Sequence, residues 1–322
     1  MRVINAGFKS KLIDLGRRGM QHMGYCQSGP ADQNSYKLAN LLLRNAPDAV
    51  AIEIMFGGLE LKIEQDMLLT LTGADCDLYI DDKHYTINQI VSVHAGQYVR
   101  VSAPRAGLYS YLALSHEVVS PLHLNSVCAV ERERLGGSEN NGVGLKAMQC
   151  IELANRHVEP EQLSYVSILN ESPNQKALDG IMTPISRCVV VRFVPGYQYS
   201  EFTHTQVALF KGQKHEVTHH ISSMGVKLKG LPIDIGKVTM YSEGISKGAI
   251  QVTPNGQAII MLHERQTIGG YPKIGSVISA DIPILAQCQA GTHVQFVECD
   301  VDTAREMLLL RHDKFQRCFG LS

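Results

Sequence analysis

Short apolar segments separated by turn residues recur through residues 50–114, and this spacing constrains the fold more than any other feature. The segments follow one another at roughly ten-residue intervals with Gly or Asp between them, which is typical of a β-barrel or β-sandwich. No alternation of strands with helices accompanies them, which disfavours a doubly wound sheet. The predicted strands are Ala51–Met55, Leu59–Ile63, Leu68–Leu71, Leu78–Ile80, Ile90–Val93, Tyr98–Ser102 and Tyr109–Leu114.

A second β-rich region begins at Cys188. The nearly continuous apolar run Cys188–Val194 predicts a strand that is buried on both faces. Both halves run in the order strand, helix and then many strands, so we expect two β-barrel domains. The polar, proline-containing residues 151–187 place the boundary, giving domains at 1–185 (with the linker) and 186–322. The further predicted strands are Glu216–Thr218, Lys227–Lys229, Ala249–Val252, Ile259–Leu262, Ser276–Ser279 and His293–Val297.

Three short helices are expected among the strands. Residues 33–45 carry apolar side chains at three- and four-residue spacing, with Asp32 in position to cap the first turn. Ser200 is the expected cap of a helix over 201–211. A Thr303-x-x-Glu306 capping box predicts a last helix over 303–312.

Composition excludes several classes of function. Lys and Arg number 30 against 31 Asp and Glu, and Trp is absent, so nucleic acid and anionic membranes are not expected as partners. The eight cysteines form no Cys-x-x-Cys pair, and the adjacent His219 and His220 would face opposite sides of a strand, so we expect no metal site. Neither a signal peptide nor a membrane-length apolar run is evident, which predicts a cytoplasmic protein.

A dense group of polar residues lies at 263–281, directly after the apolar run 258–262. Paired glycines permit positive φ angles and a close backbone approach, and the following proline fixes its own φ. A rigid loop at a strand end is a frequent place for function, but a polar tight turn has the same composition. The residues leave both interpretations open. The segment contains Glu264, Arg265, Gln266, Thr267, Gly269, Gly270, Tyr271 and Asp281.

A second polar group lies in the first half of the chain. Arg17 offers a planar fork suited to a carboxylate or phosphate, while Glu53 interrupts an apolar strand. One interpretation is a structural network in which Arg17 pairs with Glu53 or Asp32; the other is that Arg17 and Asp32 bind a substrate. Gln251 similarly interrupts an apolar strand, where it would line a pocket or satisfy a backbone group.

Several motifs occur together in one order: Gly-Arg-x-Gly, Ser-Gly-Pro-x-Asp, Leu-Thr-Gly-Ala-Asp, Gly-Ala-Ile-Gln-Val-x-Pro-x-Gly and Arg-Gln-Thr-x-Gly-Gly-Tyr-Pro-Lys-Ile-Gly. In these the chain resembles the biotin-dependent carboxyltransferase family. That family includes allophanate hydrolase subunit 2, the matching part of urea amidolyase, the Kip-type antagonist proteins and the C subunit of 5-oxoprolinase. The resemblance covers nearly the whole chain and implies two cyclophilin-like β-barrel domains. It also implies a companion subunit of the type of allophanate hydrolase subunit 1 or the B subunit of 5-oxoprolinase.

The function expected from this resemblance is that of the C subunit of a 5-oxoprolinase-like complex, which opens 5-oxoproline to glutamate with ATP. The chain has no P-loop, so we expect any ATP site to be shared with partner subunits. It has no Met-Lys-Met biotin-attachment site, so biotin would come on a separate chain.

The resemblance also assigns roles within the two polar groups. Glu264, Arg265 and Asp281 are the predicted catalytic residues. The predicted substrate-binding residues are Arg17, Asp32, Gln251, Gln266, Thr267, Gly269, Gly270 and Tyr271.

The chain departs from the family pattern at several positions. Ser223 stands where the family usually has Arg, and Glu264 where Asp is more common. Further departures fall at Tyr109, Ser115 and Val143. Lost arginines are lost anion contacts, so two alternatives stay open: a non-catalytic regulatory subunit of the Kip type, and a carboxyltransferase acting on a urea-like substrate with a biotinyl partner.

Overall fold

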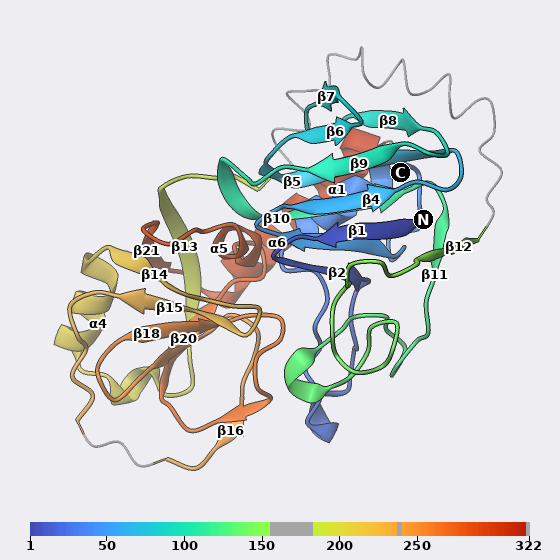
Figure 1. Cartoon of the computed structure of the whole chain (residues 1–322). Coiled ribbons are helices and arrows are strands. Elements are labelled where there is room, and N and C mark those ends of the chain that lie inside the picture. Colours follow the sequence, from blue (N-terminus) through green and yellow to red (C-terminus); the bar gives the residue numbers. More distant parts are fainter. Residues whose placement is uncertain (155–182, 237–239, 320–322) are drawn as a thin grey trace. The chain divides into compact units, whose positions relative to one another are not determined.

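The computed structural model describes residues 1–154, 183–236 and 240–319 (Figure 1). The chain divides into two compact units. The first unit comprises Met1–Arg17, Ser28–Thr183 and Cys318–Ser322, and the second comprises Arg18–Gln27 and Pro184–Arg317. The units therefore differ from the predicted ranges 1–185 and 186–322 mainly in residues 18–27, which group with the second half of the chain. The domain boundaries themselves stay a prediction.

The first unit is built from two five-stranded sheets around one apolar core. Leu61 and Val99 enter this core from one sheet, and Ile54, Leu69 and Leu112 enter it from the other. The first sheet has the order β1 (Arg2–Ala6), β4 (Leu59–Lys62), β9 (Tyr98–Val101), β6 (Leu78–Ile80) and β7 (Lys83–Tyr85). The second has the order β2 (Lys9–Ile13), β3 (Ala51–Met55), β10 (Ala106–Leu114), β5 (Met67–Asp75) and β8 (Ile90–Val93). A separate pair joins β11 (Glu117–Val119) to β12 (Glu152–Ala154).

Helix α1 (Gln33–Leu42) is the α-helix described within the first unit's 28–154 segment. Asp32 caps it as predicted, because its Oδ1 accepts hydrogen bonds from the backbone N of Asn34 at 3.0 Å and of Ser35 at 3.2 Å. The helix ends three residues before the expected Asn45. Asn45 instead donates from its amide to the Leu114 carbonyl oxygen at 2.9 Å, which ties the chain after the helix to β10.

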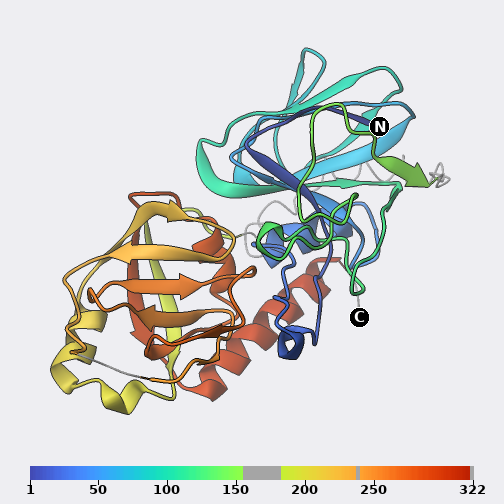
Figure 2. The same cartoon turned by 60° about the horizontal axis from the view of Figure 1, so that its bottom comes forward.

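The second unit contains a closed seven-stranded barrel (Figure 2). Its core includes Phe193, Phe210 and Phe296, whose rings stack or meet edge to face. The barrel order is β13 (Cys188–Pro195), β20 (Lys273–Val277), β17 (Ala249–Val252), β18 (Ala258–Met261), β15 (Gly225–Lys229), β14 (His215–Ile221) and β21 (His293–Glu298). A short pair, β16 (Glu243–Gly244) and β19 (Ile268–Gly269), lies outside this ring. The mainly β fold with few helices is confirmed.

One prediction about burial in the barrel was wrong. Strand β13 is not buried on both faces: Val189, Val191 and Phe193 are buried, while Cys188 and Val190 are exposed. The run is apolar except for Arg192, but the strand has only one face against the barrel core. The apolar character of the outer residues therefore misled the sequence-based expectation.

Two predicted helix starts in the second unit were also wrong. Helix α4 (His204–Gly212) is capped by Thr203 and Gln206 rather than by Ser200, which lies in the 3-10 turn Tyr199–Glu201. Helix α6 (Val301–Phe319) begins before Thr303, because the Asp300 carboxylate accepts the Thr303 backbone N–H at 2.7 Å. The short helix α5 (Ile282–Ala286) and the 3-10 turns Gln21–Met23 and Glu131–Glu133 complete the helical elements described. Of the helices in the described residues, none combines the length and apolar character needed to cross a membrane.

The buried His215 makes the stability of the second unit depend on pH. Burial lowers the pKa of His215 below its usual value, and its Nε2 contacts the Phe210 carbonyl oxygen at 2.9 Å among aromatic rings. The unfolded chain binds a proton at His215 below about pH 6.5, whereas the folded chain resists it. We therefore expect the free energy of unfolding to fall as the pH drops below that value, by up to about 1.4 kcal/mol per pH unit. Denaturant titrations between pH 7.5 and 5 measure this dependence. His215→Gln should flatten it, and substitution of the exposed His293 should not; an unchanged slope in His215→Gln would contradict the assignment.

Candidate functional site

The polar loop after β18 is held at both ends by backbone hydrogen bonds. Leu262 N donates to the Met224 carbonyl oxygen at 2.9 Å, and Glu264 N donates to that of Ser223 at 2.8 Å. Further along, Gly269 pairs with Glu243 in the β16–β19 ladder. The loop between these points is therefore fixed to neighbouring strands, which suits a site that must hold side chains in place.

Arg265 is the buried cation of this loop, with 5% of its surface exposed. Its Nε donates to the Ile245 carbonyl oxygen at 2.9 Å, and its Nη2 donates to Gln21 Oε1 at 3.1 Å. Nη1 makes a longer contact of 3.5 Å with the Leu262 carbonyl oxygen. All three acceptors are neutral. Burial lowers the pKa of Arg265, with the Cys26 thiol opposing the shift, yet a guanidinium stays protonated near neutral pH. The positive charge is thus held in place without a carboxylate among its hydrogen-bond partners in the described residues.

Gln251 brings a second donor to the same loop. Its side chain lies in the middle of β17, is 1% exposed, and its Nε2 has no hydrogen-bond partner among the described residues. A Cβ on Gly269 would meet Gln251 Nε2 at 3.1 Å and Ile245 Cδ1 at 2.5 Å. Ile245 therefore lies next to both Arg265 and Gly269, since its carbonyl oxygen accepts from Arg265 and its side chain fills the space beside Gly269. A buried amide donor without a partner costs stability, and such a group is expected to serve a bound ligand or water.

The other residues predicted in this segment are less enclosed. Gln266 and Thr267 are partly buried, Gly270 is exposed, and Tyr271 is 43% exposed. The Thr267 carbonyl oxygen accepts from Ile245 N at 2.9 Å, so its backbone takes part in the same framework. Their predicted role in binding substrate stays a prediction.

The two glycines of the loop have different structural requirements. Neither adopts a positive φ, so that reason for the paired glycines was wrong. The close approach holds for Gly269 alone, because a Cβ on Gly270 would meet only Ser242 Oγ at 3.6 Å and the Met240 carbonyl oxygen at 3.8 Å.

Gly269→Ala is therefore expected to lower the free energy of unfolding of the second unit by roughly 1–3 kcal/mol through overpacking. Gly270→Ala is the matched control, expected to stay within about 0.5 kcal/mol of the parent. Denaturant unfolding of both variants measures the difference. Equal effects of the two substitutions would show that the space beside Gly269 is not restrictive.

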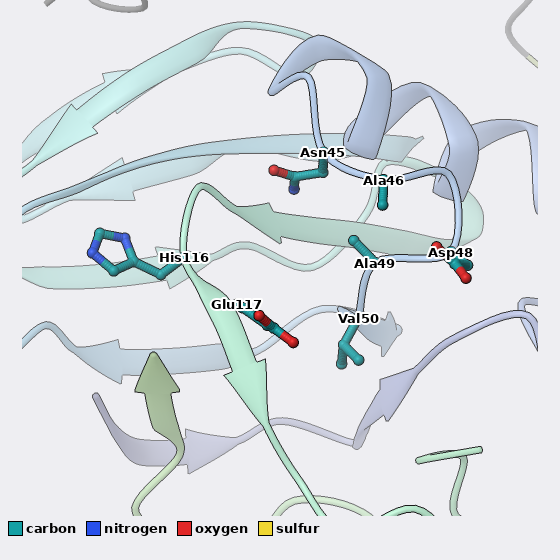
Figure 3. A pocket seen from close by; sticks show the side chains of 7 residues that line it. All are labelled: Asn45, Ala46, Asp48, Ala49, Val50, His116 and Glu117. Atoms are coloured by element: carbon teal, nitrogen blue, oxygen red, sulfur yellow. The ribbon is translucent and has the colours of Figure 1, made fainter. Parts of the chain in front are cut away.

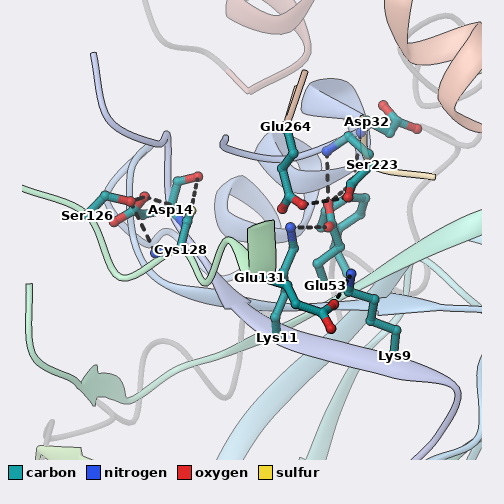
Figure 4. A network of polar contacts seen from close by, with 12 residues as sticks. Lys9, Lys11, Asp14, Asp32, Glu53, Ser126, Cys128, Glu131, Ser223 and Glu264 are labelled. Carbon is teal, nitrogen blue, oxygen red and sulfur yellow. Dashed lines mark hydrogen bonds and ion pairs between the residues drawn. The ribbon is translucent and has the colours of Figure 1, made fainter. Parts of the chain in front are cut away.

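Two departures from the family pattern meet in one contact. Ser223 Oγ donates to Glu264 Oε2 at 2.5 Å, and Glu264 is 4% exposed (Figure 4). The hydroxyl stands where the family pattern has Arg, and the carboxylate stands on a side chain one methylene longer than the usual Asp. Ser223 thus supplies Glu264 with a directed hydrogen-bond donor from the position where the family pattern has Arg.

Some polar residues of the second unit were not singled out from the sequence. Gln198 Nε2 and Lys273 Nζ both donate to Glu243 Oε1, and these two donors lower the pKa of Glu243. Gln21 is the other unexpected member, because it lies 244 residues from Arg265 in the chain. Lys273 stands inside a quoted family motif, which was its only signal; Gln21 had none.

Asp281 is a buried carboxylate in an ion pair with the partly exposed Arg192. Its Oδ2 accepts from the backbone N of Arg192 at 2.8 Å and from Nε at 2.9 Å, and its Oδ1 accepts from Nη2 at 2.6 Å. Asp281 has 0% of its surface exposed. This bidentate arrangement explains the residue's burial on structural grounds, and its predicted acid–base role stays a prediction.

In the first unit, Arg17 does not pair with Glu53 or Asp32, so the proposed network was wrong in that respect. Its Nε donates to the His123 carbonyl oxygen at 3.1 Å, its Nη2 donates to that of Cys128, and its Nη1 has no partner among the described residues. Arg17 is 1% exposed. Its contacts therefore fasten the segment around residues 123–128, and substrate binding by Arg17 stays a prediction.

Glu53 is neutralised by a different cation. Lys11 Nζ lies 3.4 Å from Glu53 Oε1, while Oε2 accepts from Ala31 N and from the Tyr111 hydroxyl at 2.8 Å each (Figure 4). The same tyrosine hydroxyl accepts from Asp32 N at 2.7 Å. Asp32, 0% exposed, is thus occupied with the start of α1, where it also accepts from the Thr183 hydroxyl at 3.0 Å.

A surface cavity of about 470 Å³ lies elsewhere in the first unit. Figure 3 shows the side chains that line it: Asn45, Ala46, Asp48, Ala49, Val50, His116 and Glu117. The two carboxylates, Asp48 and Glu117, are exposed to solvent. None of the predicted site residues lines this cavity.

A run with metal-binding spacing occurs in the barrel, at residues 215–219. It reads His-Glu-x-x-His, which on a helix would place both imidazoles on one face to bind zinc. Here it lies in strand β14, where His215 is buried and His219 is exposed. Among the described residues no group of three or more His, Cys, Asp or Glu side chains is placed to hold a metal ion.

Comparison with known proteins places these motifs in a family. Residues 23–298 match the family described as carboxyltransferase domain, subdomain A and B. The chain is 30% identical over 323 residues to the C subunit of 5-oxoprolinase of Escherichia coli, covering 99% of this chain and 96% of that protein. It is 29% identical to the C subunit of 5-oxoprolinase of Haemophilus influenzae, covering 95% of this chain and 93% of that protein. It is 24% identical to the urea amidolyase of Lachancea kluyveri, of which it spans 16%.

Solved structures agree on the fold. The crystal structure of the Kluyveromyces lactis urea carboxylase matches with a TM-score of 0.86 at 22% identity, covering 98% of this chain and 29% of that one. The urea amidolyase of the same organism matches with a TM-score of 0.85 at 21% identity, and this chain spans 20% of it. With the family match covering most of its length, the chain belongs to the family of carboxyltransferase domains with subdomains A and B.

Proposed function

We propose that this chain is the C subunit of a 5-oxoprolinase, which opens 5-oxoproline to glutamate with ATP and partner subunits. The observation that carries the proposal is Arg265, a buried cation held by neutral acceptors, in a loop that also faces the unpartnered amide nitrogen of Gln251 at Gly269. 5-Oxoproline bears one carboxylate and one lactam, which require a cation and neutral hydrogen-bond donors. The names of the two relatives at 29% and 30% identity support the same activity.

In this proposal each residue of the loop has a separate role in binding or catalysis. Arg265 binds the anionic group, and Gln251 donates to the substrate. The backbone around Thr267, Gly269 and Gly270 orients the reacting amide, where preorganised donors stabilise developing negative charge. Glu264, held by Ser223, is the acid–base residue closest in sequence to Arg265.

Partners and ATP complete the proposal. A companion subunit, of the type of the B subunit of 5-oxoprolinase or allophanate hydrolase subunit 1, would finish the active site in the cytoplasm. The loop of this chain offers one buried cation, which suits a single anionic group better than a triphosphate. ATP is therefore proposed to bind at a site shared with the partner subunits, where it supplies the driving force for opening the ring.

The test is glutamate formation by the reconstituted complex. The chain, co-purified with its companion subunits, should release glutamate from 5-oxoproline only when ATP is present. Glu264→Gln removes the charge and keeps the shape, and is expected to lower kcat by roughly 10²–10⁴-fold. Glu216→Gln, on the exposed side of β14, is the matched control and should retain full activity. A complete complex that forms no glutamate would refute the proposed function.

A second candidate is a non-catalytic regulatory subunit of the Kip type. The observation that favours it is Ser223, a neutral side chain at a position where the family pattern has Arg. This candidate predicts binding of a partner without turnover. The family match is also compatible with a carboxyltransferase that acts together with a separate biotinyl chain. Inhibition by avidin would reveal that activity.

A further inference from the structure

We infer that Gln21 is a positioning residue, which fixes the guanidinium of Arg265 through a neutral acceptor and so keeps its charge available to an anionic ligand. Gln21 lies in the 3-10 turn Gln21–Met23, within the segment 18–27 that groups with the second unit. The nature of the ligand, a small carboxylate, rests on the proposed function. The role of Gln21 itself rests on its hydrogen bonds to Arg265 and Ile245.

The Gln21 amide uses both of its ends. Its Oε1 accepts from Arg265 Nη2 at 3.1 Å, and its Nε2 donates to the Ile245 carbonyl oxygen at 3.0 Å. That same oxygen accepts from Arg265 Nε at 2.9 Å. The three groups thus form a closed ring of hydrogen bonds. Because the guanidinium is planar, bonds at Nε and Nη2 fix its orientation about both the side-chain axis and the Cζ–Nε bond.

The orientation of the Gln21 amide follows from its partners. Arg265 only donates, so it must face the amide oxygen, and the Ile245 carbonyl only accepts, so it must face the amide nitrogen. A second, longer contact from Nε2 to the Thr267 carbonyl oxygen at 3.4 Å agrees with this orientation. No side chain without both a donor and an acceptor would satisfy the two contacts at once.

The neutrality of the acceptor matters as much as its position. A carboxylate at residue 21 would accept the same hydrogen bond from Arg265 but would also neutralise its charge. Gln21 itself is exposed and Arg265 is buried, so a carboxylate at residue 21 would repel a bound anion across a site that is only partly shielded from water. An apolar side chain at residue 21 would leave the charge in place but free the guanidinium to turn.

Two substitutions of the full-length chain separate these effects. Gln21→Glu keeps the acceptor and adds charge, and Gln21→Met keeps the length and removes the acceptor. Nitrogen-15 NMR of the Arg265 side chain should show restricted rotation of the guanidinium in the parent and in Gln21→Glu, and averaged rotation in Gln21→Met. The probes are 5-oxoproline, its carboxamide as the uncharged match, and inorganic phosphate as a second anion.

The parent is expected to respond to 5-oxoproline and not to the carboxamide. Gln21→Glu should weaken anion binding roughly ten- to hundredfold, the range expected for loss of a charged hydrogen bond. In the assembled complex the same variant should raise KM for 5-oxoproline and leave kcat within a few-fold. Met23→Glu is the control, since it adds a charge to the same turn at a side chain that is 56% exposed.

The outcomes distinguish this inference from the proposed function. Unchanged Arg265 rotation in Gln21→Met, or parental anion binding in Gln21→Glu, would overturn the role of Gln21 even if the complex forms glutamate. If the complete complex forms no glutamate, the proposed function fails, and the response of Arg265 to phosphate in the two variants still decides the role of Gln21.

Discussion

Arg192→Met is expected to destabilise the second unit by roughly 3–5 kcal/mol, the cost of leaving a buried carboxylate without its partner. Asp281 is fully buried and receives three hydrogen bonds from Arg192, one from its backbone and two from its guanidinium. Only the backbone bond survives the substitution. The Arg192 side chain is 32% exposed, so water can reach part of the vacated site, and the lower end of the range is expected.

Denaturant unfolding of the second unit measures this effect. Arg187→Met is the matched control, because Arg187 is exposed near the start of the same strand and should change stability by less than about 0.5 kcal/mol. Asp281→Asn provides the complementary test, since it removes the charge and keeps most of the shape. Loss of activity in Asp281→Asn with stability unchanged would point to the predicted acid–base role rather than to the structural role.

The strands were predictable where local pattern and tertiary burial agree. Ala51–Met55, Leu78–Ile80 and Ile90–Val93 begin and end as expected, because turn residues bracket each apolar run. Strand β13 shows the limit of this reasoning. Its exposed residues Cys188 and Val190 are apolar, so the local sequence does not show which face of the strand is buried. Which face of a strand is covered is decided by the rest of the barrel, not by the strand itself.

The caps show the same limit at shorter range. Helix α4 is capped by Thr203 and not by Ser200, and α6 starts directly after Asp300 and not at Thr303. All four are residue types that cap helices well. A capping side chain needs the correct backbone geometry as well as the correct chemistry. That backbone geometry depends on the path of the chain between the preceding strand and the helix.

The candidate site was predictable as a segment but not as a set of contacts. Its glycines and Arg265 stand within one motif of the sequence and Glu264 directly precedes it, so the family resemblance identified them together. The partners that give them their properties lie elsewhere: Gln21 is 244 residues from Arg265, and Ser223 is 41 residues from Glu264. Such pairs are created by folding. For the same reason the sequence suggested the wrong partner for Arg17. Its guanidinium donates to backbone carbonyl oxygens, which cannot be identified as partners from the pattern of side chains.

Arg265→Met is expected to lower kcat/KM for 5-oxoproline by roughly 10- to 100-fold, because a hydrogen bond to a charged group contributes about 1.5–3 kcal/mol. The loss should appear mainly in KM if Arg265 binds the substrate carboxylate equally in the ground and transition states. Arg265→Lys keeps the charge but not the planar fork, so it should recover only part of the loss. Steady-state kinetics of the assembled complex, with the free energy of unfolding measured in parallel, separates binding from stability. Parental kinetics in both variants would show that the buried charge of Arg265 belongs to the fold and not to the substrate, and would move the search for the anion site to other residues of the complex.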